Sequence, residues 1–94
     1  MGGGLGFEWH DQKAAENVRK HGVRFETATR VFDDPMAIYA EDDSQAYGER
    51  REIVIGAVDA SVLFVVFVER RADVMRIISA RLATAQERRR YANG

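Results

Sequence analysis

The sequence is defined first by what it lacks. It contains no cysteine, one proline and two histidines in 94 residues. Without thiols, disulfides, thiolate zinc sites and cysteine nucleophiles are all excluded. The longest apolar run, SVLFVVFV at 61–68, has the length of a buried strand and falls short of the roughly 20 residues of a membrane helix. The N-terminal MGGGLG lacks the basic region and apolar core of a signal peptide, so we expect residues 1–6 to be flexible.

Lysine is also scarce. Only Lys13 and Lys20 are lysines among 14 basic residues, and the formal net charge is −1. Arginines gather after residue 69 and acids gather between 33 and 52. Such asymmetry is typical of a polyanion-binding surface beside an acidic segment, although a solvated surface with internal ion pairs gives the same composition. Guanidinium groups bind phosphate in a two-pronged geometry and stay charged, so they suit charge stabilisation and serve poorly as bases.

Local patterns predict the order of the elements. FEW at 7–9 predicts a strand, and a helix capped by Asp11 is expected over 11–21, ending at Gly22. A second helix is expected over 25–32 and is stopped by the DDP segment at 33–35. Strands are expected at 36–40, 51–58, 62–69 and 74–80, with a polar loop at 41–49. Thr84 and Glu87 form the capping box of a last helix.

These elements define the fold class. Successive strands joined by short turns form an antiparallel meander. The middle strands are apolar on both faces, so each face needs a cover, and the two early helices supply one. We therefore predict a single α+β domain over 7–94, a small sandwich in which a short N-terminal strand and two helices pack on the meander sheet and a short helix follows.

The segment RIISAR at 76–81 raises the question of which arginines share a site. In a regular strand Arg76 and Arg81 point to opposite faces, so they form one clamp only if the strand ends or bulges near Ala80. On a helix, Arg88 and the two arginines after it lie about 100° apart, so at most two of the three face one ligand.

Other polar and aromatic residues leave alternatives open. His10 and His21 lack the spacing of metal ligands, so we expect no metal, and no glycine-rich loop indicates a nucleotide cofactor. His21 ends a helix and is either a capping or a catalytic residue. Trp9 is either a core residue or a base-stacking platform, and Tyr91 either stacks on a base or packs on the sheet.

The composite pattern is more specific than its parts. KHGV, VFDDP, IG and RIISAR occur in that order in the segments FEWHDQKAAENVRKHGVRFETATRVFDDP, GERREIVIGAV, LFVVFVERR and MRIISARLATAQERRRY. From about residue 7 to 91 the chain closely resembles the BrnT family of bacterial type II toxins. The resemblance implies a RelE-like fold and a metal-independent, cytoplasmic endoribonuclease that inhibits translation. It also implies a ribbon-helix-helix BrnA-type antitoxin, a 2:2 complex, and DNA contact only through that antitoxin.

The resemblance also suggests roles for residues. Phosphate charge would be stabilised by Arg81 and Arg70, and protons would be moved by His21, Lys20 or Glu69. The remaining positions expected to contact RNA are Lys13, Trp9, Arg76, Arg88 and Tyr91. Of the RIISAR pair, Arg81 is the expected phosphate contact, while Arg76 braces the sheet or meets the partner. A histidine base near the end of the central strand, which many members have, is replaced here by VFV at 66–68. The alternative function is a catalytically inactive module of the same fold that binds an antitoxin or another protein.

Overall fold

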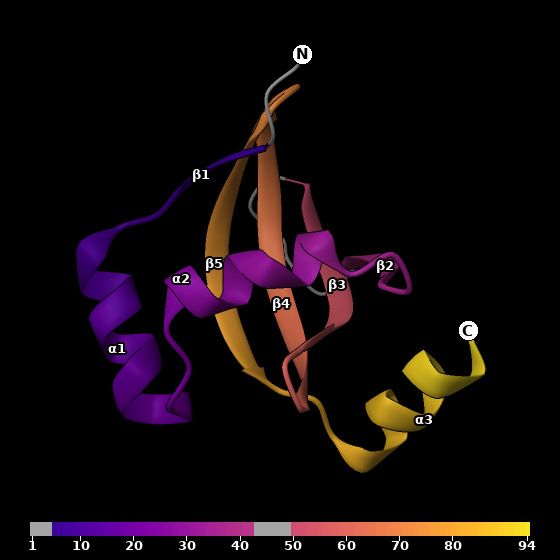
Figure 1. The fold of residues 1–94 in the computed structure, drawn as a ribbon. Helices are drawn as coiled ribbons and strands as arrows, with labels where there is room; N and C mark the ends of the chain where they lie inside the picture. The colour runs from indigo at the N-terminus through magenta and orange to yellow at the C-terminus, as the bar shows by residue number, and fades with distance from the viewer. Residues whose placement is uncertain (1–4, 43–49) are drawn as a thin grey trace.

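A five-stranded sheet forms the centre of the computed structural model, which describes residues 5–42 and 50–94. The strands are β1 (Gly6–Glu8), β2 (Ile38–Asp42), β3 (Arg51–Val58), β4 (Ser61–Arg71) and β5 (Val74–Leu82). They lie in the order β1-β5-β4-β3-β2, with β1 parallel to β5 and every other pair antiparallel (Figure 1). The predicted meander is therefore confirmed, and β1 extends it at the β5 edge.

Four helical segments surround the sheet. They are α1 (Asp11–His21), α2 (Phe25–Ala28), the short 3-10 helix η1 (Thr29–Asp33) and α3 (Ala85–Asn93). Gly22 ends α1 in the left-handed conformation at φ 70°, as its sequence predicts. The capping box of α3 is confirmed, because the Thr84 hydroxyl accepts from the Glu87 N–H and the Glu87 carboxylate accepts from the Thr84 N–H.

Several boundaries differ from the sequence-based expectation. Asp11 does not cap α1: it is the first helical residue, and the cap position belongs to His10. Gly6, expected in the flexible N-terminus, starts β1 and donates its N–H to the Asp73 carbonyl at 2.6 Å. The strand β2 begins two residues late and continues through Asp42, which the sequence placed in a loop. The rest of that loop, 43–49, and residues 1–4 lie outside the described residues.

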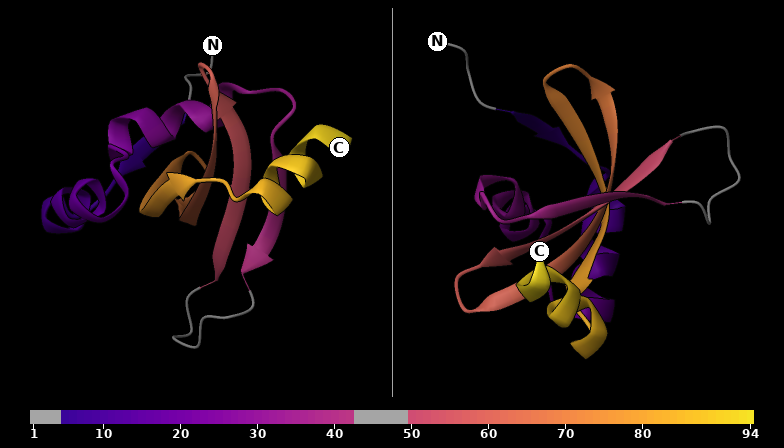
Figure 2. Two further views of the ribbon diagram at one scale, coloured as in Figure 1. Left: turned by 90° about the horizontal axis from the view of Figure 1, so that it is seen from below. Right: turned by 90° about the vertical axis from the view of Figure 1, so that its right-hand side faces the viewer.

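One face of the sheet carries the core. α2 and η1 cover this helix-side face, and α1 lies along the β5 edge of the sheet (Figures 1 and 2). On this face Val54, Val65 and Ile77 are essentially fully buried. Phe25, Ala28 and Val31 fill the space between helices and sheet with no exposed surface. Gly56 permits this close approach, because a Cβ there would lie 3.2 Å from atoms of Val31. The core therefore fixes how the helices sit on the strands.

The opposite face is partly covered by α3. Arg81 of β5 pairs with Glu87 of α3, and the Tyr91 hydroxyl donates to Asp34 Oδ2 at 2.5 Å. Asp34 Oδ2 also accepts the Ala57 N–H at 2.8 Å. That N–H and the Tyr91 hydroxyl stabilise the carboxylate and lower the pKa of Asp34. We call this side of the sheet the α3-side face.

A bulge in β5 corrects the prediction for RIISAR. Val66 pairs with Ser79 but Phe67 pairs with Ile77, so Ile78 is the extra residue. Arg76 then pairs with Val68, and Arg81 with Phe64. Since positions 64 and 68 share a face of β4, both arginines lie on the α3-side face. The prediction of opposite faces was wrong because one inserted residue reverses the alternation.

Candidate nucleic-acid interface

Two arginines share one carboxylate at the β1 end of the sheet. The parallel pairing of β1 with β5 sets Glu8 opposite Arg76. In the neighbouring strand β4 a register shift between Glu69 and Arg71 leaves Arg70 without a partner residue on β5. The Nε atoms of Arg70 and Arg76 each lie 3.3 Å from Glu8 Oε2. Their side chains are 40% and 22% exposed. We call Arg70 and Arg76 the arginine clamp, because both partly exposed side chains contact the carboxylate of Glu8.

A groove follows α1, the helix that begins three residues after Glu8. It consists of two hollows that share Lys13 and Glu16. The larger one, of about 460 Å³, is lined by His10, Asp11, Gln12, Lys13 and Glu16. The smaller one, of about 150 Å³, is lined by Lys13, Glu16, Asn17, Lys20, His21, Ile78 and Ser79. This α1 groove therefore brings both lysines of the chain to the bulged edge of β5.

Asn17 holds the groove together. Its side chain is buried, donates from Nδ2 to the carbonyls of Val23 at 2.9 Å and Ala80 at 2.8 Å, and accepts the Ala80 N–H at 3.1 Å. β1 pairs only with residues 74–76 of β5, so Ala80 has no strand neighbour on that edge. The amide of Asn17 supplies the missing partners and fixes α1 against β5.

Arg81 lies in a different setting. Its guanidinium forms two hydrogen bonds with Glu87, at 2.8 and 3.0 Å, and stacks 4.0 Å from the centre of the Phe64 ring. This pairing raises the pKa of Arg81 and lowers that of Glu87. Six strand positions separate Phe64, its partner, from Arg70, which corresponds to about 20 Å. The structure therefore does not bring Arg81 and Arg70 to one phosphate.

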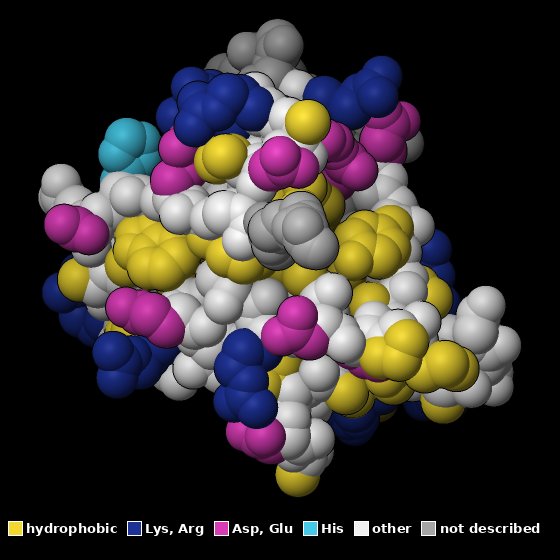
Figure 3. Space-filling model, turned by 45° about the horizontal axis from the view of Figure 1, so that its top comes forward, with side chains coloured by type: hydrophobic (Ala, Val, Ile, Leu, Met, Phe, Trp, Pro, Cys, Tyr) yellow, Lys and Arg dark blue, Asp and Glu magenta, His cyan; other side chains and the backbone are white. Residues whose placement is uncertain are grey.

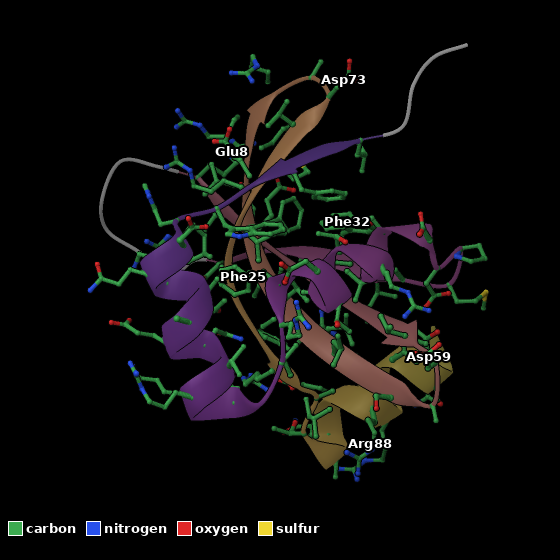
Figure 4. All side chains as sticks on the ribbon, turned by 60° about the vertical axis from the view of Figure 1, so that its left-hand side comes forward. Glu8, Phe25, Phe32, Asp59, Asp73 and Arg88 are labelled. Carbon is green, nitrogen blue, oxygen red and sulfur yellow. The ribbon has the colours of Figure 1, made fainter. Side chains whose placement is uncertain are left out.

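The other predicted site residues divide by location. Trp9 packs edge-on against Phe25, with ring centres 5.8 Å apart, so it is a core residue and the stacking prediction is not supported. Glu69 pairs with Met75 on the helix-side face, away from Arg76. Arg88 donates to the Ala83 carbonyl at 3.1 Å, and Tyr91 bonds Asp34. Glu8 and Arg88 lie at opposite ends of the molecule (Figure 4), so neither Arg88 nor Tyr91 is near the clamp.

Glu8 is the site residue that the sequence reasoning missed. The signal was present in FEW, where an acid alternates with two aromatic residues and must therefore point away from the core that they enter. Basic and acidic side chains and a histidine gather at this end of the molecule (Figure 3). Within residues 5–42 and 50–94 no three histidine, cysteine or acidic side chains are grouped as a metal site. Across the same ranges, no helix has the length and apolarity needed to cross a membrane.

Comparison with solved structures identifies the fold. The 1.1 Å crystal structure of the Brucella abortus ribonuclease toxin BrnT superposes with a TM-score of 0.66 at 20% sequence identity. The match covers 85% of this chain and 97% of that one. At this level of identity the likeness shows a shared α+β fold and nothing further about residues. No curated protein sequence matches the chain.

A family model gives the more specific result. The model described as "Ribonuclease toxin, BrnT, of type II toxin-antitoxin system" matches residues 9–87. The chain belongs to this family, and the predicted recognition is confirmed. It is accordingly a ribonuclease toxin of a type II toxin–antitoxin system, with RNA as substrate and an antitoxin as partner.

Proposed function

We propose that this toxin is a metal-independent endoribonuclease that cleaves RNA in the cytoplasm and thereby inhibits translation. The observation that supports the proposal is the arginine clamp, in which Arg70 and Arg76 converge on a single anion at 3.3 Å each. Guanidinium groups also bind phosphate, which is larger than a carboxylate and offers more oxygens to two arginines. We therefore assign the scissile phosphate to the clamp.

Internal attack on RNA needs the kind of help that this site offers. When a 2′-hydroxyl attacks the neighbouring phosphorus, negative charge builds on the equatorial oxygens. Permanently charged guanidinium groups stabilise that charge without exchanging protons. Arg70 keeps the role that the resemblance suggested for it. Arg76 takes the role suggested for Arg81, because Arg76 contacts the same carboxylate as Arg70 and Arg81 does not.

The α1 groove extends the site along the RNA backbone. Lys13 and Lys20 are seven helical residues apart, or about 10 Å along α1, and both line the hollow beside Ser79. Ammonium groups along a helix bind phosphates of the RNA backbone without reading sequence. We assign Lys13, Lys20 and His21 to this binding track rather than to proton transfer.

The antitoxin is proposed to be a BrnA-type ribbon-helix-helix protein in a 2:2 complex, which contacts DNA only through the antitoxin. Glu8 illustrates how inhibition would work, because a carboxylate already occupies the clamp. Acidic side chains of the antitoxin that approach the same two arginines exclude the RNA phosphate. Binding of the antitoxin should therefore weaken as salt rises, and a complex insensitive to salt would contradict this picture.

An RNA cleavage assay tests the proposed function. Wild-type protein in excess EDTA should cut a mixed-sequence RNA to fragments with 5′-hydroxyl and 2′,3′-cyclic phosphate ends. Arg70→Ala should cleave about 10²–10³-fold more slowly. The matched control is Arg30→Ala, which removes the same charge and an exposed ion pair with Asp59 far from RNA. Intact RNA with the wild type, together with tight antitoxin binding, would favour the inactive binding module instead.

A further inference from the structure

Glu16 lies where the two hollows of the α1 groove meet. It lines both of them, the larger one of about 460 Å³ and the smaller one of about 150 Å³. Glu16 is half-buried, whereas Lys13 and Lys20, which lie along the same side of α1, are exposed. The wall of a groove that both lysines also line therefore contains a carboxylate.

The two lysines do not pair with this carboxylate. Glu16 lies three residues after Lys13 and four residues before Lys20, and these are the spacings at which ion pairs form on a helix. Within residues 5–42 and 50–94, however, the Glu16 side chain forms no ion pair with either lysine or with any other cation. Its oxygens can therefore accept hydrogen bonds from a ligand.

A carboxylate beside a path for RNA needs a specific partner. Phosphate groups repel it, so Glu16 lowers the affinity of the binding track unless it meets a hydrogen-bond donor. Single-stranded RNA offers donors on its 2′-hydroxyl groups and on the edges of its bases. Guanine is the base whose Watson–Crick edge presents two neighbouring N–H donors, at N1 and N2. These two donors match the two oxygens of a carboxylate in a two-pronged, charge-assisted pair.

The larger hollow has the other groups that a base pocket uses. Gln12 lies one helical turn before Glu16, so the two residues share a side of α1, and both line this hollow. His10 lines it as well and is exposed, and an imidazole is one of the flat side chains on which unstacked bases stack. The volume of about 460 Å³ falls within the range of about 300–1,000 Å³ of small-ligand sites. The hollow therefore has the size and the lining for one base.

A cation is the other ligand that a carboxylate without a partner attracts, and the groove fits a cation less well. Asp11 also lines the larger hollow, but in the part of the chain that the structure describes no three histidine, cysteine or acidic side chains are grouped as a metal site. Lys13 lines both hollows beside Glu16 and repels a second cation there. The N–H donors of a base fit the groove better.

We propose that the α1 groove reads guanine: Glu16 accepts the N1–H and N2–H hydrogen bonds of a guanine base in the larger hollow, while Lys13 and Lys20 hold the RNA backbone. The proposal rests on the proposed ribonuclease function and adds a sequence preference to it. Glu16 determines specificity and takes no part in proton transfer. The preferred class of substrate is therefore single-stranded RNA that contains guanine.

Three matched substrates test this reading. They are oligouridylates that carry one guanosine, one inosine or one adenosine at the same position; inosine lacks the N2 amino group, and adenosine lacks both donors. Wild-type protein should cleave the guanosine strand about 5- to 150-fold faster than the adenosine strand, the usual discrimination of a two-pronged base contact, with the inosine strand between them. Glu16→Gln should lower this ratio to about 1 or below, because an amide offers one donor and one acceptor, as adenine requires.

The ratio of rates separates base reading from a general effect of charge. Glu16→Gln removes a repulsion from the phosphates, so it should raise the affinity for all three strands. A purely electrostatic role for Glu16 would raise the three rates equally and leave their ratio unchanged, which would overturn the proposal. The matched control is Glu26→Gln, which removes the same charge from an exposed ion pair with Arg24 and should leave the ratio as in wild type.

Binding measurements keep the proposal separate from the cleavage reaction. Non-cleavable 2′-deoxy versions of the three strands should bind wild-type protein in the same order, with guanosine tightest and adenosine weakest. Equal affinities and equal cleavage rates would overturn the guanine site and leave the proposed ribonuclease function intact. A wild-type protein that cleaves no RNA but keeps the order of affinities would uphold the guanine site and overturn the proposed function. A protein that neither cleaves nor discriminates would overturn both.

Discussion

The two ends of β5 place arginine on the same face of one sheet and use it differently. At one end, Arg76 shares a carboxylate oxygen with Arg70, with contacts of 3.3 Å each. At the other, Arg81 forms two short hydrogen bonds with Glu87, which also closes the capping box of α3. At the clamp two guanidinium groups share the Glu8 carboxylate, whereas Glu87 pairs with Arg81 through both of its carboxylate oxygens. The comparison indicates that Arg76 shares a site with Arg70 and that Arg81 is a brace.

The largest difference is expected in catalysis. Arg76→Ala should lower the rate of RNA cleavage about 10²–10³-fold, which is the usual effect of removing one donor to a developing oxyanion. Arg81→Ala should stay within about 5-fold of wild type when the folded fractions are matched, because a brace contributes no donor to the phosphate. Single-turnover rates at low temperature measure both. Equal losses in two fully folded variants would place Arg81 in the site after all.

The next largest effect is expected on stability, at Asn17, whose side-chain amide fixes α1 to β5 between the two ends of the strand. Asn17→Ala should lower the free energy of unfolding by about 2–4 kcal/mol, since it leaves the Ala80 N–H and carbonyl buried without their partners. Urea titration followed by circular dichroism measures it. Arg19→Ala, an exposed change on the same helix, should stay within about 0.5 kcal/mol. A loss below 1 kcal/mol for Asn17→Ala would mean that water replaces the amide.

The two carboxylates provide a smaller, matched contrast in stability. Glu87→Gln should cost about 1–2 kcal/mol, because it weakens a bidentate, partly buried pair and one half of a helix cap. Glu8→Gln should change the free energy of unfolding by less than about 0.5 kcal/mol, because its partly exposed ion pairs are longer, at 3.3 Å, and close no helix cap. Thermal unfolding of the two variants at neutral pH tests the contrast. The reverse order would make Glu8 the structural residue and remove the distinction between the two ends.

The smallest expected effect is on the stability of the protein at acid pH. Arg81 lowers the pKa of Glu87 in the folded protein, so folding is favoured while this carboxyl is ionised. That contribution is full above the unfolded pKa, about 4.3, and is lost as the pH falls through the lower folded pKa. The melting temperature of Glu87→Gln should therefore decline less steeply than that of wild type below about pH 4.5. Parallel curves would show that acid unfolding is governed by other groups, such as Asp34.

Much of the site could be predicted and its assembly could not. The alternation within FEW follows from the period of a strand, and the spacing of Lys13 and Lys20 follows from the period of a helix. The sequence therefore predicts on which side of its element each of these side chains lies. The capping box at Thr84 was likewise local. The pairing of Glu8 with Arg76 was not, because β1 and β5 are more than 60 positions apart and nothing local specifies a parallel neighbour at the sheet edge.

The sequence by itself determined the order of the elements, the antiparallel meander, the helix ends at Gly22 and Thr84, and the family. These depend on periodicity and on short-range chemistry that any residue window contains. Tertiary structure alone decided which arginines meet. The extra residue at Ile78 turns Arg76 and Arg81 to one face of the sheet. Arg81 is then paired with Glu87, which ties β5 to α3. Register shifts and ion-pair partners depend on packing between distant segments, and no local pattern records them.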